Sequence, residues 1–316
     1  MSHQTKDNFT KVRAFPMPPK NFDPITADEK SLAHFGIPKR PDRENNPDAF
    51  KHWQRLFANS VPRIEPEFFY PDKPIHTSKP IARNGGGANG PGLANWAGAV
   101  VWGEVTGKRY VESSGMWVIP HLVMPGLNPS LPPAPSIGPA CLMSTWVGLD
   151  GYDTPSVSQA GISQGIDISG SALPFLNGIG AWIEMWPASP VWVANFPVQV
   201  GDIVEVAVSV STVVPNQIVA SFINWTQVVG TAVGFGEYLF EGMSAEWIVE
   251  SPDYEAFVLP DFGAVTFLET QATDRSGNLA PLSARVALNM EDSGQSVMAK
   301  SQIFEQYVNI VWIEAG

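Results

Sequence analysis

The stretch "DIVEVAVSVST", residues 202–212, decides the fold class of this chain. Every second residue from Val204 to Val210 is a valine, and the residues between them are polar or small. An alternation of period two is typical of a strand with one buried face. Similar stretches recur, and turn sequences such as "VGD", "TDRSGN" and "EDSG" separate them. Many short strands without helical patterns between them predict an all-β fold, an antiparallel sandwich or barrel.

The first 90 residues differ from the rest in composition. Residues 1–90 hold 14 of the 19 Lys+Arg and 10 of the 31 Asp+Glu, a net charge of +4, so residues 91–316 carry −16. The segment is rich in proline, and its apolar residues Phe50, Trp53, Leu56 and Phe57 predict one short helix within residues 47–60. The glycine-rich stretch "NGGGANGPG", residues 84–92, predicts a flexible joint. We therefore expect a basic N-terminal extension, residues 1–90, and an acidic β domain, residues 91–316, that attract each other.

Several classes of function are disfavoured by composition. A net charge of −12 disfavours nucleic-acid binding. The sequence contains no run of about 20 apolar residues, so no membrane span is predicted. Cys141 is the single cysteine, which rules out an intramolecular disulfide and a cysteine-rich metal site. No histidine follows His121, so "GISQG" (161–165) does not fit a serine–histidine hydrolase. We expect no metal and no cofactor, which leaves carboxylates and amides for any chemistry.

Two such carboxylates lie in the apolar stretch "SAEWIVESPDY", residues 244–254. A period of two places Glu246 and Glu250 on the same side of a strand, with Ile248 between them. By itself an acid on a strand is most often solvated or structural. Neither residue would stand out without its sequence context.

That context consists of six blocks in a fixed order: "NWAGAV" (95–100), "GMWVIP" (115–120), "TWVGLDG" (145–151), "SQAGI" (158–162), "AWIEMWP" (181–187) and "SAEWIVESP" (244–252). The series resembles the glutamic peptidases, or eqolisins, over about residues 91–316. The resemblance implies an antiparallel two-sheet β-sandwich of the jelly-roll, lectin-like type. It also implies an acid-acting endopeptidase that cleaves polypeptides, with little sensitivity to pepstatin. Its catalytic pair would be Glu250, which activates water, and Gln159, which stabilises the oxyanion.

The resemblance also assigns a substrate groove. The positions expected to line or support it are Trp96, Trp146, Asp150, Glu184 and Trp186, and Glu246 would line or buttress the same cleft. Some relatives have an acid four residues after the catalytic glutamine, where this chain has Ser163. This difference bears on the pH profile and the subsites.

Relatives are commonly made as precursors, so residues 1–90 are expected to act as a removable pro-segment. The basic extension would then lie across the acidic cleft and bind the catalytic domain in cis. Relatives are secreted, yet the N-terminus "MSHQTKDNFTKVRAF" has no apolar run of the kind found in a signal peptide.

Two alternatives use the same features differently. A non-catalytic, lectin-like sandwich could bind carbohydrate on its tryptophans, and a glycosidase could use Glu184 and Glu250 as paired carboxylates. Gln159 discriminates between these functions, because only the peptidase needs it.

Overall fold

The computed structural model describes residues 8–58, 61–72, 80, 92–125, 140–167, 178–236, 240–252, 257–292, 296–305 and 307–313. Its helices are α1 (Glu29–His34), α2 (Pro47–Phe57) and α3 (Gly103–Thr106), with a 3-10 turn at Leu282–Ala284. Its strands are β1 (Val12–Ala14), β2 (Phe68–Phe69), β3 (Gly92–Leu93), β4 (Trp96–Trp102), β5 (Tyr110–Val118), β6 (Ala140–Leu149), β7 (Val157–Asp167), β8 (Ile179–Trp186), β9 (Val191–Val193), β10 (Ile203–Val210), β11 (Ile218–Asn224), β12 (Val229–Phe235), β13 (Ser244–Glu250), β14 (Ala264–Asp274), β15 (Arg285–Glu291), β16 (Val297–Phe304) and β17 (Tyr307–Trp312).

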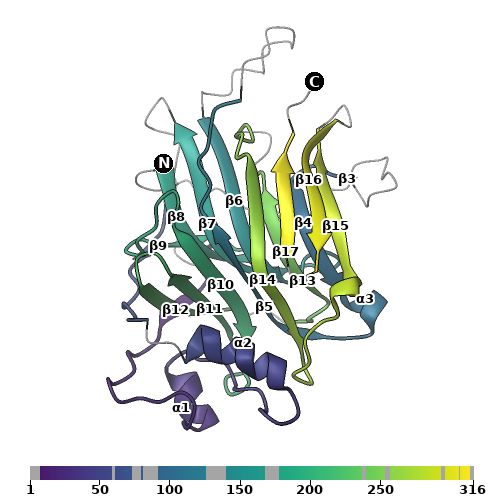
Figure 1. Ribbon diagram of the computed structural model, residues 1–316. Coiled ribbons are helices and arrows are strands. Elements are labelled where there is room, and N and C mark those ends of the chain that lie inside the picture. The colour runs from purple at the N-terminus through teal and green to yellow at the C-terminus, as the bar shows by residue number, and fades with distance from the viewer. Residues whose placement is uncertain are drawn as a thin grey trace.

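The strands form one sheet that folds back on itself as a sandwich (Figure 1). One half, which we call sheet I, has the order β2-β9-β8-β7-β6-β13-β4-β15. The other half, sheet II, has the order β14-β5-β10-β11-β12-β1. Strands β16 and β17 join the two halves between β15 and β14. All these pairs are antiparallel, and β3 adds one parallel pair to β15, so the predicted fold class is confirmed.

Alternating side chains fill the space between the sheets. In β10 the valines at 204, 206 and 208 enter the main core, while Glu205, Ala207 and Ser209 face outward. Sheet I contributes Trp247 and Val249 from β13 to the same core. The period of two read from residues 202–212 therefore identifies the side chains that enter the core, but the opposite face of β10 is buried as well, partly under the N-terminal extension.

The N-terminal extension packs on the outer face of sheet II. Helix α2 begins with Pro47 in its first turn and buries Trp53, Leu56 and Phe57, together with Ala207 and Ile223 of β10 and β11. The prediction of a short helix within residues 47–60 is confirmed. Figure 1 shows α1 and α2 together beside β10, β11 and β5, away from β7 and β8.

Polar contacts accompany this packing. Arg55 of α2 donates to Glu205 Oε2 at 2.6 Å, and the Glu205 side chain is fully buried. His52 Nε2 lies 2.8 Å from Ser114 Oγ and 3.6 Å from Glu112 Oε1. Arg55 Nη2 faces His52 Nδ1 at 3.2 Å. Because Nδ1 accepts from this guanidinium, Nε2 carries the proton and donates it toward Ser114.

Two short strands tie the extension to the edges of the sandwich, since β1 pairs with β12 and β2 pairs with β9. The described part of the extension thus contacts sheet II and both edges, whereas the sequence led us to expect it across the cleft. Outward-facing acids of sheet II are the reason, because they offer partners to its basic residues. Residues 73–79 and 81–91 lie outside the described residues, and so does the predicted joint 84–92 apart from Gly92. Within the described ranges, no helix has the length and apolarity needed to cross a membrane.

Candidate active site

The outer face of sheet I carries a cluster of tryptophans. Four of them, Trp96, Trp146, Trp182 and Trp192, are buried there with Ile248 of β13. Their strands lie side by side, and the register places Ile248 opposite Trp146, Trp146 opposite Gly161, and Gly161 opposite Trp182. The tryptophans thus form a continuous apolar surface across β13, β6, β7 and β8.

Glu250 ends β13 on this face. The Trp146 indole Nε1 donates a hydrogen bond to Glu250 Oε2 at 2.8 Å, and both side chains are fully buried. Trp96 packs edge-on against Trp146, with ring centroids 4.8 Å apart. Packing on the indole therefore fixes the orientation of the carboxylate.

Gln159 lies in β7 on the same face. It is opposite Gly148 of β6 and Glu184 of β8, and its Nε2 donates to Glu184 Oε2 at 2.9 Å. This hydrogen bond orients the amide group of Gln159. The register therefore brings Gln159, Glu184, Glu246 and Glu250 to one face, as the sequence predicted for Glu246 and Glu250.

Two glycines make room for the Trp146 ring. A Cβ on Gly148 would lie 2.8 Å from Trp146 Cζ3, and a Cβ on Gly161 would lie 2.5 Å from Trp146 Cβ. No real Cβ tolerates such contacts, so Gly148 leaves room for the indole ring, while Gly161, whose added Cβ would also lie 2.3 Å from Thr145 O, allows the close approach of the β6 backbone at Trp146. These are the glycines of the "TWVGLDG" and "SQAGI" blocks.

Glu246 occupies the middle of β13 and is fully buried. Burial raises its pKa well above the ordinary value, and the nearby Asp150 carboxylate adds to this, while the Ser244 hydroxyl opposes it. The charged form of a buried carboxyl group is disfavoured because it loses its hydration. Glu246 is therefore a neutral acid in the folded chain well above the pH at which glutamate normally ionises.

Asp150 was expected to line the groove, and the structure gives its carboxylate another task. Its two oxygens accept backbone N–H groups of Glu241, Gly242 and Met243 at 3.0, 3.1 and 2.7 Å. Burial raises the pKa of Asp150, and the same three hydrogen bonds oppose the rise. Asp150 holds the chain where it enters β13 and so supports the position of Glu246 and Glu250.

The remaining predicted residue, Trp186, is half-buried at the end of β8, against the tryptophan cluster. Sequence reasoning missed Trp182 and Trp192, although Trp182 stands two residues before Glu184 and so shares its face by period two. It also missed Ser144, whose hydroxyl is 2.5 Å from that of Ser163 in the row beside Glu250.

In this structure the candidate face is closed to solvent, because Gln159, Glu184, Glu246 and Glu250 are all fully buried. Within the described residues no three His, Cys, Asp or Glu side chains are grouped as a metal site would need.

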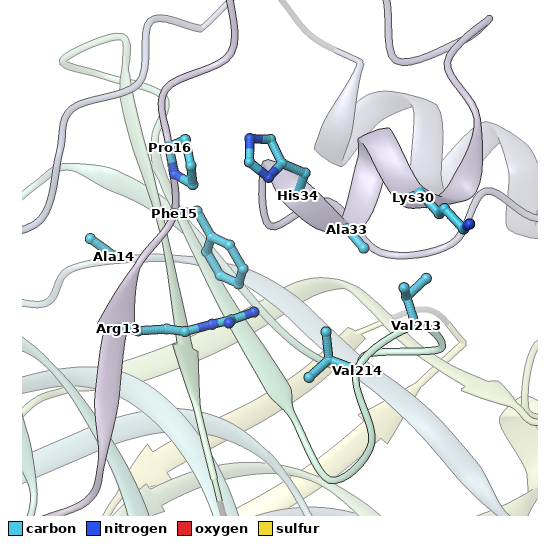
Figure 2. Close-up of a pocket in the computed structure, with 9 residues that line it drawn as sticks. All are labelled: Arg13, Ala14, Phe15, Pro16, Lys30, Ala33, His34, Val213 and Val214. Atoms are coloured by element: carbon cyan, nitrogen blue, oxygen red, sulfur yellow. The ribbon is translucent and has the colours of Figure 1, made fainter.

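An open pocket of about 430 Å³ lies elsewhere, between the extension and the connection from β10 to β11 (Figure 2). Arg13, Lys30 and His34 surround an apolar floor formed by Phe15 and Val214. None of its lining residues belongs to the predicted site.

Comparison with known proteins shows what the chain is similar to. Residues 94–312 match the model of the Peptidase A4 family. The chain is 27% identical over 253 residues to Aspergillopepsin-2 of Aspergillus niger, covering 75% of this chain and 84% of that protein. Among solved structures it resembles scytalido-glutamic peptidase bound to a transition state analog inhibitor, with a TM-score of 0.54 and 18% identity over 70% of this chain and 98% of that chain. It also resembles SCP-B, an eqolisin in complex with the tripeptide Ala-Ile-His, with a TM-score of 0.50, 17% identity and the same two coverages.

Proposed function

This chain belongs to the Peptidase A4 family and is a glutamic-type peptidase, and from this premise we propose that Glu250 and Gln159 hydrolyse peptide bonds of polypeptide substrates. One observation carries the proposal. The two side chains leave the same face of sheet I, on either side of the Trp146 ring. Family membership does not favour the carbohydrate-binding alternative.

Glu250 is the proposed general base. Trp146 donates to Oε2 and orients the carboxylate, which would take a proton from the attacking water and return it to the leaving nitrogen. Unperturbed glutamate titrates near pH ~4.3, so we expect the enzyme to act in acid.

Gln159 is the proposed oxyanion donor. Glu184 accepts a hydrogen bond from Nε2 and orients the amide, which would donate to the oxyanion of the tetrahedral intermediate. Losing one such donor typically lowers kcat by a factor of about 100 to 1000. Because the amide does not ionise, this role persists across the acid range.

The strand register limits where the substrate lies. Gln159 and Glu250 lie two strands apart and in rows four residues apart along the strands, and Trp146 lies in the row between them. The scissile carbonyl would therefore lie above Trp146, where both side chains converge on it. Of the other expected groove residues, Trp96, Glu184 and Trp186 would support this position from neighbouring strands.

Digestion of a denatured protein from about pH 2 to 7 tests the proposal. Glu250→Gln is expected to abolish cleavage and Gln159→Ala to lower kcat by two to three orders of magnitude. The exposed residues Glu104 and Gln302 provide matched controls as Glu104→Gln and Gln302→Ala. Full activity in Glu250→Gln would refute the assignment of the base. Pepstatin should inhibit wild type little.

We also propose that residues 1–90 bind the catalytic domain in cis through sheet II and act as a pro-segment. The docking of α2 on sheet II and the pairing of β1 and β2 with the edge strands support the binding in cis. Acid incubation followed by N-terminal sequencing tests it. A chain that remains whole while it cleaves substrate would contradict the pro-segment.

A further inference from the structure

Glu246 shares a cross-strand row with the proposed oxyanion donor. Reading across β13, β6, β7 and β8, Glu246 is opposite Gly148, Gly148 is opposite Gln159, and Gln159 is opposite Glu184. Gly148 has no side chain, so only the edge of the Trp146 ring stands between Glu246 and Gln159. Glu246 therefore faces the same surface as the proposed catalytic pair.

Glu246 also lies among polar atoms that lack partners. The carboxyl group is completely buried, and within the described residues the Ser244 hydroxyl is near enough to lower its pKa but is not placed for a hydrogen bond to either oxygen. On the same face and within the same ranges, the Ser244 hydroxyl and the indole N–H groups of Trp96, Trp102 and Trp182 also lack a hydrogen-bond partner. Buried polar groups in native proteins are nearly always hydrogen-bonded, and each one left without a bond is costly. A group of such atoms on one face indicates a surface completed by a hydrogen-bonding ligand.

The protonation state of Glu246 decides which ligand fits. Acidic groups face it from several elements: Asp150 from the connection after β6, Glu184 from β8 and Glu250 from its own strand. Burial, with a smaller contribution from the Asp150 carboxylate, raises the pKa of Glu246 and keeps its carboxyl group neutral in acid. A neutral carboxyl group has one O–H donor and one C=O acceptor, which complement the C=O and N–H of a peptide backbone.

We propose that Glu246 binds the backbone of the polypeptide substrate, donating to one carbonyl oxygen and accepting from one amide N–H. This inference rests on the proposed function and names a subsite for it. Glu246 and Glu250 are four positions apart in β13, so their backbones are about 13 Å apart along the strand. Three to four residues of an extended substrate span this distance. The contact therefore lies away from the scissile bond and favours long substrates over short ones.

The test compares two peptide substrates at acid pH with the full-length chain. One peptide extends at least five residues on each side of the cleaved bond, and the other extends only two. Glu246→Gln retains a donor and an acceptor, whereas Glu246→Met has similar length and neither. We expect Glu246→Gln to resemble wild type, and Glu246→Met to lower kcat/KM about tenfold on the long peptide through KM. In Glu246→Met the short peptide should lose less kcat/KM than the long peptide, whereas the control variant Glu104→Gln, at an exposed position, should cleave both peptides as wild type does.

Equal losses on both peptides, or equal losses in both variants, would refute the subsite, because a merely structural role has no dependence on substrate length. An unchanged Glu246→Met would refute it as well. The proposed function fails separately, if wild type cleaves neither peptide or if Glu250→Gln still does. Both variants avoid a cavity, and urea unfolding confirms that each is folded before the kinetics are compared.

Discussion

Removing the Trp53 side chain tests whether the extension is an integral part of the fold. Trp53 of α2 is 1% exposed, donates its indole N–H to Pro38 O at 3.0 Å, and packs against Phe50 and Phe57. Truncating a buried tryptophan to alanine typically costs about 3–5 kcal/mol. An eleven-residue helix is marginal on its own, so most of the stability of α2 comes from this packing.

Trp53→Ala should therefore detach α2 rather than unfold the sandwich. A loss of about 4 kcal/mol corresponds to an opening equilibrium about a thousandfold larger. Hydrogen exchange of the amides in residues 47–57 measures this directly, and urea unfolding measures the global effect. Val105, which is 66% exposed, provides the control variant Val105→Ala, expected within ~0.5 kcal/mol of wild type.

Wild-type exchange rates in Trp53→Ala, with a stability change below about 1 kcal/mol, would show that α2 is not packed on sheet II. A large increase in exchange confined to the extension would show that it docks as a separable unit. That outcome bears on the pro-segment, because a segment held by apolar packing stays bound after the chain is cut.

Three further predictions concern the candidate site. The folded-state pKa of Glu246 is raised, so its contribution to stability is complete below the unfolded value near pH ~4.5 and is lost as pH rises. Urea unfolding should therefore give Glu246→Gln the same free energy of unfolding as wild type at pH 4. Above that pH the variant should be more stable than wild type by about 1.4 kcal/mol for each pH unit, until the folded-state pKa is reached. Asp150→Asn should lower the free energy of unfolding by about 2–3 kcal/mol at pH 6, because an amide NH₂ group cannot accept the backbone hydrogen bonds that the second carboxylate oxygen accepts. A smaller loss of stability would contradict the role of Asp150 in holding residues 241–243. Ser163→Asp places a carboxylate two strands from Glu250 and should move the acid limb of the kcat profile up by about 0.5 to 1 pH unit; an unmoved limb would argue against Glu250 as the base.

Local patterns in the sequence predicted the parts of the fold that depend on local periodicity. The alternation in residues 202–212 gave β10 and its buried face, and helical spacing gave α2. The same period placed Glu246 and Glu250 on one face, as the register has them. These inferences succeed because the direction of a side chain within one element follows from the backbone geometry alone.

Contacts between distant parts of the chain could not be predicted in this way. Asp150 meets backbone groups 91 to 93 residues away, and nothing near position 150 distinguishes such an anchor from a groove residue. Glu205 looked like an ordinary solvated acid in an alternating strand, yet Arg55 and α2 bury it completely. The location of the extension depends on such pairings, so the sum of charges predicted attraction but not which sheet receives it.

The buried acids of sheet I fit the proposed activity in acid. Burial raises the pKa of both Glu246 and Asp150, so each group contributes most to stability when protonated and less as pH rises. A carboxylate left charged on this face at neutral pH would lack hydration and would face like charges nearby. At acid pH Glu246 is neutral and has one O–H donor. The neutral carboxyl group that we propose binds a peptide backbone is therefore also the form that destabilises the fold least. A substrate-binding surface made of neutral acids leaves Glu250 with fewer charged neighbours when it ionises.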